Sequence, residues 1–488
     1  MTNLARFLLL VFLFEGAVHA QGAPPSLQTS PGKLTVAEAD AARDGVPFRL
    51  FSAWLEAFNS GDAARLGAFL ESSWPGGTMN RELSLRDRSG GFDLRALEEA
   101  TATSLIGVMQ ERDSDQFVRF NIVVKAEEPQ RIASLNRLAI PRPAEFPVPF
   151  MSEAEIIAAL RARLEKDSAA DRFSGAVLVA RNGKVLFSEA YGLADREKKV
   201  ANTLDTRFRI GSMNKMFTGT AILQLVQAGK VKLTDPLGRF LDDYPDKDTA
   251  SKVTIHHLLT HTGGTGDIFG PAFDRHRLEL RTHNDYVALY GHRSPAFEPG
   301  TRWEYSNYGM VLLGRVIEKA SGQSYYEYVA RRIYKPAGMT RSGSEPESKD
   351  VPGRSIGYLR APGAAKWLAN TDTLPFRGTS AGGGYSTVGD LLKFSEALLG
   401  NKLLDAEHTQ LLLTGKVDTP AGKYAYGFDD LRRDGAGALG HAGGAPGMNG
   451  MLRIFPKSGY VVVVLSNFDP PAAQRVAGFL ELRLELKD

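Results

Sequence analysis

Cysteine is absent from the sequence, which excludes several kinds of chemistry at once. Without a thiol the chain forms no disulfide, offers no thiolate to a metal ion and has no cysteine nucleophile. The 488 residues are enough for two or three domains of ordinary size. Each domain must then be held together by its own apolar core, which a chain of this length can bury.

Long apolar runs are equally scarce. The longest run after the N-terminus, residues 460–465, is far shorter than a membrane span and predicts a buried strand. Residues 7–14 form an apolar stretch between Arg6 and a small-residue exit, which is typical of a cleaved secretory signal. We therefore interpret residues 1–20 as a signal peptide and residues 21–33 as a flexible lead. The protein is expected to be exported, periplasmic or secreted, without a stable membrane span.

The sequence also lacks a strong excess of either charge. It has 59 lysines and arginines against 56 aspartates and glutamates, a formal net charge of +3. The two signs are interspersed, whereas a nucleic-acid-binding chain gathers basic residues on one face or segment. We therefore predict no nucleic-acid partner, and the composition indicates no particular oligomeric state.

The first predicted domain covers residues 34–138. Apolar residues recur at helical spacing between Phe48 and Phe58, and later stretches alternate as strands do. Helices followed by strands over such a length predict a small α+β domain, which resembles the cone-shaped NTF2-like domains. Its sequence contains no catalytic constellation and indicates no particular function. The proline-dense residues 139–150 are interpreted as a stiff linker.

The second predicted domain covers residues 151–488 and also belongs to the α+β class. It begins with an amphipathic helix near Ile156 and continues into a hairpin that turns at Asn182-Gly183. A second hairpin turns at residues 456–459, and helical segments dominate the chain between the two hairpins. This order predicts an antiparallel sheet flanked by helices, together with a helical lobe.

The central motif of this domain is Ser212-Met213-Asn214-Lys215. A strand-like lead-in ends at Gly211, and a long run of helix formers follows. A helix that starts at Ser212 places its hydroxyl near unpaired N–H groups and places Lys215 one turn further on the same face. A partly desolvated lysine can activate a serine, which is a poor nucleophile by itself. We predict that Ser212 is the nucleophile and Lys215 its activating partner; the alternative is an ordinary helix cap.

A later aromatic loop contains the next two candidate residues, Tyr305 and Asn307. They are two positions apart, so in an extended loop both side chains project to the same side. A tyrosine whose pKa is lowered by a neighbouring lysine can relay a proton, and an asparagine can hold a substrate amide or orient the lysine. The alternative is a loop whose rings serve only in packing.

A glycine-rich segment contains His441, Gly443 and Gly444. Glycines let a ligand approach the backbone closely. The N–H of Gly444 could pair with that of Ser212 to stabilise an oxyanion, and His441 could contribute a hydrogen bond or, depending on pH, a charge. The alternative is a glycine-rich turn with a solvated histidine.

Three histidines, His256, His257 and His261, raise the question of a metal site. His257 and His261 have the i, i+4 spacing of a helical metal pair. The catalytic glutamate of the H-E-x-x-H motif is missing, since Leu258 takes its place. We therefore predict no metal site and interpret the cluster as helix-end packing or capping. A metallohydrolase is the less favoured alternative.

Three motifs occur in an order that resembles the serine β-lactamase and penicillin-binding-protein superfamily: Ser212-x-x-Lys215, Tyr305-x-Asn307 and His441-x-Gly443. The tyrosine-bearing middle motif is similar to that of the class C β-lactamase branch, with its esterase and D-amino-acid peptidase relatives. The resemblance covers about residues 174–488 and does not reach the first domain.

This resemblance implies a mechanism. Ser212 attacks a carbonyl carbon and is acylated, while Lys215 and Tyr305 take its proton, pass it to the leaving group and later activate the hydrolytic water. The N–H groups of Ser212 and Gly444 hold the oxyanion, and Asn307 helps to position the substrate. The resemblance implies a small ester, amide or peptide substrate and neither a metal nor an organic cofactor.

One departure from the family pattern concerns the third motif. β-Lactamases usually have a lysine where this sequence has His441. A histidine is mostly neutral at pH 7 and binds the carboxylate of a penicillin or peptide less well than a permanent cation does. We therefore predict an esterase or peptidase-like hydrolase with weak or absent β-lactamase activity. The alternative is a non-catalytic or single-acylation, penicillin-binding-like sensor or scaffold.

Overall fold

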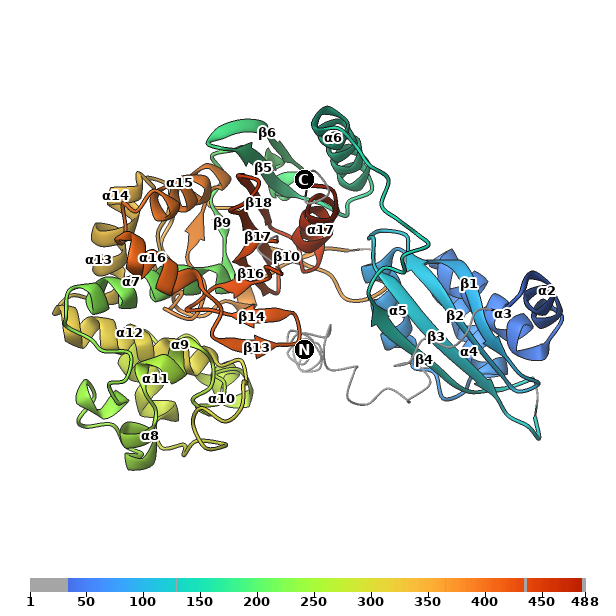
Figure 1. The fold of residues 1–488 in the computed structure, drawn as a ribbon, viewed down its shortest axis with the longest axis horizontal. Helices are drawn as coiled ribbons and strands as arrows, with labels where there is room; N and C mark the ends of the chain where they lie inside the picture. The colour runs from blue at the N-terminus through green and yellow to red at the C-terminus, as the bar shows by residue number, and fades with distance from the viewer. Residues whose placement is uncertain (1–33, 129, 365, 434–436, 485–488) are drawn as a thin grey trace. The chain divides into compact units, whose positions relative to one another are not determined.

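The structure, a computed structural model, describes residues 34–128, 130–364, 366–433 and 437–484. The predicted signal peptide and flexible lead lie outside these residues. Two compact units are present: residues 34–150 with Arg360–Trp367, and Met151–Leu359 with the chain from Leu368 onward (Figure 1). All residues of the candidate site belong to the second unit.

The N-terminal unit contains an antiparallel sheet of four strands that follow one another in chain order. Its elements are α2 (Val36–Arg43), α3 (Val46–Ser60), α4 (Ala63–Ser73), α5 (Met79–Ser89), β1 (Phe92–Ala100), β2 (Ser104–Glu111), β3 (Phe117–Val124) and β4 (Ile132–Ile140). The Phe51 ring of α3 is fully buried and stacks on Phe120 of β3, with 3.9 Å between ring centroids. Helix α3 is thereby fixed on the sheet.

A buried ion pair lies in the same unit. Glu82 of α5 is 0% exposed and accepts hydrogen bonds from Trp54 Nε1 at 3.1 Å and from Arg137 Nη1 at 2.8 Å. Arg137 comes from β4, so the contact joins a helix to the strand at the edge of the sheet. A buried carboxylate is tolerated only when it is paired in this way.

The C-terminal unit is built on an eight-stranded antiparallel sheet with the order β13-β14-β15-β16-β17-β18-β5-β6. The hairpin between β5 and β6 turns at Asn182 and Gly183, whose φ angles of 49° and 79° suit a two-residue turn. The strands are β5 (Gly175–Arg181), β6 (Lys184–Tyr191), β13 (Val417–Thr419), β14 (Gly422–Tyr424), β15 (Asp429–Asp430), β16 (Leu439–Ala445), β17 (Met448–Phe455) and β18 (Tyr460–Ser466).

Helices cover both faces of this sheet (Figure 1). α6 (Glu153–Ala169) and α17 (Ala472–Leu484) pack on each other and on β6, β17 and β18, while α15 (Val388–Leu399) packs on β5 and β18. Because both faces are covered, every residue of β18 is buried. This explains why residues 460–465 form a continuous apolar run without alternation.

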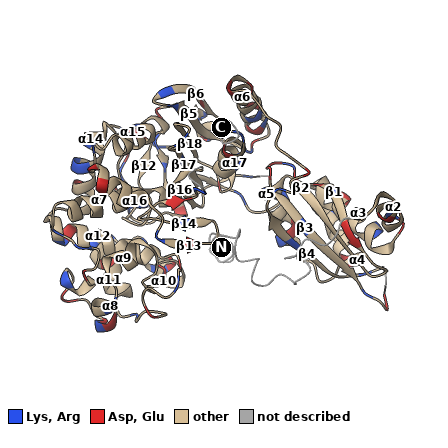
Figure 2. Cartoon of the chain, in the orientation of Figure 1, with Lys and Arg blue, Asp and Glu red and all other residues tan. Residues whose placement is uncertain are grey.

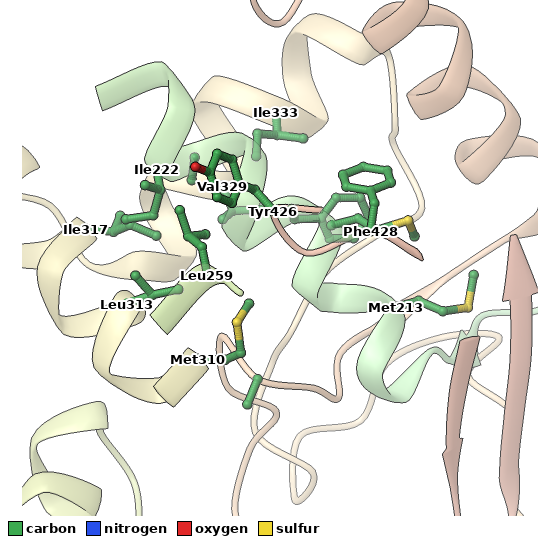
Figure 3. Close-up of a cluster of buried hydrophobic side chains, with 14 of the residues drawn as sticks. Met213, Ile222, Leu259, Met310, Leu313, Ile317, Val329, Ile333, Tyr426 and Phe428 are labelled. Atoms are coloured by element: carbon green, nitrogen blue, oxygen red, sulfur yellow. The ribbon is translucent and has the colours of Figure 1, made fainter. Parts of the chain in front are cut away.

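A helical lobe completes the unit and confirms the predicted fold class. The long helices α7 (Lys215–Gln227) and α12 (Asn307–Ser321) pack on each other, and Ile222, Leu313 and Ile317 meet in the cluster of Figure 3. The shorter helices are α8 (Lys247–Lys252), α9 (Ile255–Leu259), α10 (Pro271–His276), α11 (His283–Tyr290), α13 (Tyr325–Val329), α14 (Lys335–Ala337) and α16 (Ala406–Leu413).

Figure 2 shows acidic and basic residues interspersed along the ribbon of each unit. In the described ranges, no helix is both long enough and apolar enough to cross a bilayer.

Candidate active site

Ser212 lies in a tight turn at the start of α7. Residues Gly211–Asn214 form a single 3-10 turn, and the α-helix begins at Lys215 rather than at Ser212, where a helix start was expected. In 3-10 geometry the side chains of residues i and i+3 eclipse each other. The Lys215 Nζ accordingly donates a hydrogen bond to the Ser212 Oγ at 3.0 Å.

Lys215 is completely buried and has two further acceptors. Its Nζ donates to the Asn307 Oδ1 at 2.8 Å and to the backbone carbonyl of Ala381. Burial lowers the pKa of Lys215 to about 7, against the opposing effect of the Asp267 carboxylate. A substantial share of the amine is therefore neutral near pH 7, as a general base for Ser212 requires.

Tyr305 joins this pair from the loop before α12. Its hydroxyl is hydrogen-bonded to Ser212, and its ring centroid lies 4.7 Å from the Lys215 Nζ. The expected lowering of the Tyr305 pKa by lysine is wrong. In the structure, burial raises this pKa and outweighs the hydrogen bond with Ser212, which lowers it. Tyr305 is thus a neutral phenol that can pass on a proton, and Lys215 is the better candidate for the base.

Asn307 links Lys215 to a carboxylate that was not predicted. Because the Asn307 Oδ1 accepts from Lys215, its Nδ2 faces Asp267 and donates to both carboxylate oxygens, each at 3.1 Å. Burial raises the pKa of Asp267, whereas the hydrogen bond from Asn307 lowers it. The one sequence feature that could have pointed to Asp267 is its position directly after the glycine-rich residues 263–266.

The glycine-rich strand β16 forms another wall of the site. A Cβ atom on Gly443 would lie 1.9 Å from the Ile210 carbonyl oxygen, and one on Gly211 would lie 3.0 Å from the backbone nitrogen of Gly444. The turn that contains Ser212 therefore packs directly on β16, at a separation that side chains would prevent. This packing places the Gly444 backbone beside the turn, where an oxyanion pair with the Ser212 N–H was predicted.

His441, on the same strand, is buried rather than solvated. Its Nδ1 lies 2.5 Å from the Ala442 carbonyl oxygen and donates to it, so the Nε2 accepts a hydrogen bond from the Tyr424 hydroxyl at 3.0 Å. Burial lowers the pKa of His441 to about 4, although the Asp429 carboxylate acts in the other direction. The ring is neutral at pH 7 and offers a substrate neither a charge nor a free nitrogen.

A backbone turn at residues 379–382 also takes part in the site. The Ala381 carbonyl accepts from Lys215, and the Asn214 Nδ2 holds the turn by donating to the Thr379 carbonyl at 2.7 Å. A carbonyl contact can be made by any residue type, so the sequence gives no indication of it.

The three clustered histidines have separate partners. Helix α9 ends before His261, which has a φ of 58°, so the helical spacing to His257 is not kept. His257 caps α9, His256 Nδ1 lies 2.9 Å from the Tyr426 hydroxyl, and the His261 ring lies 4.4 Å from that of Tyr305. Among the described residues, no group of three or more histidine, cysteine or carboxylate side chains could hold a metal ion.

Fold and site together define a class of protein. An antiparallel sheet, a helical lobe, and a serine and lysine one turn apart at the start of a helix are the arrangement of the β-lactamase/transpeptidase-like serine hydrolases. Residues 158–487 match the family described as Beta-lactamase, which is well over half of the chain. The chain therefore belongs to the β-lactamase family. Residues 34–150 lie outside this match.

Known proteins of the family support the assignment. Esterase EstB from Burkholderia gladioli is 32% identical over 283 residues, which cover 51% of this chain and 72% of the esterase. A penicillin-binding protein from Bacillus halodurans has a TM-score of 0.60 and 34% identity, covering 65% of this chain and 99% of that one. A D-stereospecific amidohydrolase from Streptomyces has a TM-score of 0.56 and 29% identity, covering 67% and 98%. The protein is accordingly a serine hydrolase.

Proposed function

We propose that the protein is an exported serine hydrolase that forms an acyl-enzyme on Ser212 with ester or amide substrates, including D-amino-acid peptides, and turns over β-lactams weakly or not at all. The supporting observation is the 3.0 Å contact between the fully buried Lys215 amine and the Ser212 hydroxyl. The esterase and the D-stereospecific amidohydrolase among the similar proteins support the two substrate classes.

In acylation, the Ser212 Oγ attacks the substrate carbonyl carbon while its proton moves to the neutral amine of Lys215. A base that titrates near the working pH is the most efficient one, and burial gives Lys215 a pKa of about 7. The carbonyl oxygen becomes an oxyanion and accepts hydrogen bonds from the N–H groups of Ser212 and Gly444.

Collapse of the tetrahedral intermediate needs a proton on the leaving oxygen or nitrogen. The Tyr305 phenol, which is hydrogen-bonded to Ser212, gives its proton to the leaving group and regains one from the Lys215 ammonium. A water molecule then attacks the acyl-enzyme, with the neutral Lys215 as base again. Asn307 holds the amine in place throughout, because its amide is fixed between Lys215 and Asp267.

The burial and neutrality of the His441 ring support low activity on β-lactams. A penicillin or cephalosporin carries a carboxylate beside the scissile bond, and a buried neutral imidazole that already accepts from Tyr424 gives that carboxylate no cation. A small neutral ester has no such requirement.

A substrate panel tests the proposal: a short-chain ester, a D-amino-acid amide and a chromogenic cephalosporin. Ser212→Ala and Lys215→Ala should lose about a thousandfold or more in kcat/KM, since they remove groups that act in the reaction itself. Ser251→Ala is the matched control, because that exposed hydroxyl donates to the Lys247 and Asp248 carbonyls of α8.

Labelling separates the competing hypotheses. A fluorophosphonate should modify Ser212, and an activated ester should show steady turnover after any burst. Labelling without turnover would instead indicate a single-acylation sensor or scaffold. Activity that survives Ser212→Ala and disappears with a chelator would indicate a metallohydrolase built on the histidine cluster.

Export is supported by the charged start, apolar core and small-residue exit of residues 1–20. Expression of the full chain in a Gram-negative host, followed by fractionation and sequencing of the mature N-terminus, tests it. An uncleaved protein confined to the cytoplasm would contradict this part of the proposal.

A further inference from the structure

A small cavity lies next to the residues that hold the Lys215 amine. Its volume is about 50 Å³, and its wall includes Asn307 and Ala381, the two residues that share the Lys215 amine with Ser212. A water molecule occupies about 10–15 Å³ on this measure, so the cavity has room for a group of roughly three to five heavy atoms. It is therefore close enough to the reacting serine to receive the acyl side of a substrate.

One part of the cavity wall is apolar. Ile268, Phe273 and Pro375 line it, and the first two are almost completely buried. These side chains have no group that could bind a polar substituent. They are suited to one or two methylene groups of an acyl chain.

The other part of the wall contains an unpartnered hydroxyl. Tyr286 is 1% exposed and lines the cavity, yet its hydroxyl makes no hydrogen bond to any described residue. Burial raises the pKa of Tyr286, so the phenol keeps its proton and is a hydrogen-bond donor. A buried hydroxyl without a protein partner costs free energy unless a ligand or water satisfies it.

Arg377 supplies a positive charge on the same wall. Its Nε donates to the Ser344 carbonyl, and its guanidinium carbon lies 3.3 Å from the centroid of the Tyr326 ring. Within the described chain it forms no ion pair with a carboxylate, and its terminal nitrogens have no acceptor. Glu345, which acts on Arg377 electrostatically, accepts a hydrogen bond from Tyr385 instead. The guanidinium is thus held in place while its outer donors are unused.

We propose that this cavity binds a short acyl group that ends in a carboxylate, such as succinyl, with Tyr286 and Arg377 as its recognition residues. The inference rests on the proposed function, since Ser212 must accept the acyl group. An anion fits because a phenol and a guanidinium both donate, and arginine binds carboxylates through two parallel N–H groups. In this proposal the methylene groups pack on the apolar wall, and the carboxylate is bound by Tyr286 and Arg377.

The reaction on such a substrate is an ordinary acyl transfer. With monoethyl succinate, a bond forms between the Ser212 Oγ and the ester carbonyl carbon, the carbon–oxygen bond to the ethoxy group breaks, and ethanol leaves with the serine proton. Water then adds to the succinyl-enzyme, and succinate is released with Ser212 restored. No oxidant, reductant or co-substrate other than water takes part.

The test compares two esters of the same shape. In ethyl 4-methylpentanoate an isopropyl group replaces the carboxylate of monoethyl succinate, and ethanol release from both is followed by proton NMR. The wild-type protein should prefer monoethyl succinate by at least about tenfold in kcat/KM, the discrimination expected from charged hydrogen bonds. Equal rates on the two esters, or a preference for the neutral one, would overturn the inference.

Variants locate the preference. Arg377→Gln should abolish the preference for monoethyl succinate, because turnover of this ester falls while that of the neutral ester stays within about twofold. Tyr286→Phe should reduce the preference only in part. Arg377→Lys should retain part of the preference, because lysine keeps the positive charge but lacks the two parallel N–H groups of arginine. Arg275→Gln, an exposed change on α10, is the control and should change neither rate.

A binding measurement keeps the inference separate from the proposed function. N-Ethylsuccinamate and N-ethyl-4-methylpentanamide are titrated calorimetrically into Ser212→Ala, which cannot turn them over. Tighter binding of the succinamate by at least about tenfold, lost in Ser212→Ala/Arg377→Gln, supports the subsite even if no ester is hydrolysed. If both esters are hydrolysed through Ser212 but this difference in binding is absent, the subsite is wrong and the hydrolase proposal stands.

Discussion

The Asn307 Oδ1 lies 2.8 Å from the Lys215 Nζ, and this contact fixes the orientation of the amide. With the oxygen committed to lysine, the Nδ2 is directed at Asp267. A carboxylate thereby holds the amide that holds the base. Lys215 can lose and regain a proton in this arrangement without changing its position, because two neutral acceptors, the amide oxygen and the Ala381 carbonyl, stay in contact with it.

Asp267→Asn should therefore change both the rate and its pH dependence. The Asp267 carboxylate raises the pKa of Lys215, so its removal lowers that pKa and moves the rising limb of the pH–rate profile to lower pH. The maximal rate should fall about tenfold or more as Asn307 loses its anchor. Asp274→Asn, an exposed carboxylate of the neighbouring α10, is the control. An unchanged profile in Asp267→Asn would show that Asp267 has no part in the site.

The wild-type pH profile is a test of Lys215 itself. Only the neutral amine can take the serine proton, and its pKa is about 7, so kcat/KM on a neutral ester should rise about tenfold per pH unit below 7 and level off above it. Neither His441 nor His261, the histidines nearest to Tyr305, can produce this limb, since the pKa of His441 is about 4 and burial lowers that of His261 well below its usual value. A flat profile between pH 6 and 8 would exclude Lys215 as the base.

Spacing within short motifs was enough to select most of the residues that meet around Ser212. Lys215 and Asn307 were chosen because each follows a recognisable neighbour at fixed distance, and Gly444 because a glycine strand allows close approach. Asp267 was missed because it lies in a loop without periodicity. Ala381 was missed because it acts through a carbonyl that any residue provides.

Properties that depend on burial were harder to predict than positions. The pKa direction for Tyr305 was wrong because enclosure, which spacing does not reveal, outweighs its local interactions. Strand β1 of the N-terminal unit was not predicted for a related reason. Residues 92–96 alternate apolar and charged, but Ala96-Leu97 and Glu98-Glu99 break the pattern, and the pairing with β2 is irregular at the same place.

The buried pair in the N-terminal unit gives a prediction about stability. Glu82→Gln keeps the shape of the side chain but leaves the Arg137 charge buried without a partner, which should lower the free energy of unfolding by about 3–5 kcal/mol. Glu56→Gln, which breaks the exposed pair with Arg65, should cost less than about 1 kcal/mol. Urea titrations of both variants measure the difference. Similar midpoints for the two would show that the buried pair contributes little.

Substitution at His441 tests why β-lactams should be poor substrates. His441→Lys places a cation on β16 beside the Ser212 turn, where the wild-type ring is neutral and bonded to Tyr424. Acylation by a cephalosporin should then rise by about tenfold or more, the effect of one charged hydrogen bond, while hydrolysis of a neutral ester changes much less. His441→Gln is the matched control, because it also replaces the ring but adds no charge. Stopped-flow measurement of cephalosporin acylation compares the two. A similar rise in both variants would mean that the ring obstructs the substrate, whereas no rise in either would mean that a missing cation is not what limits the reaction.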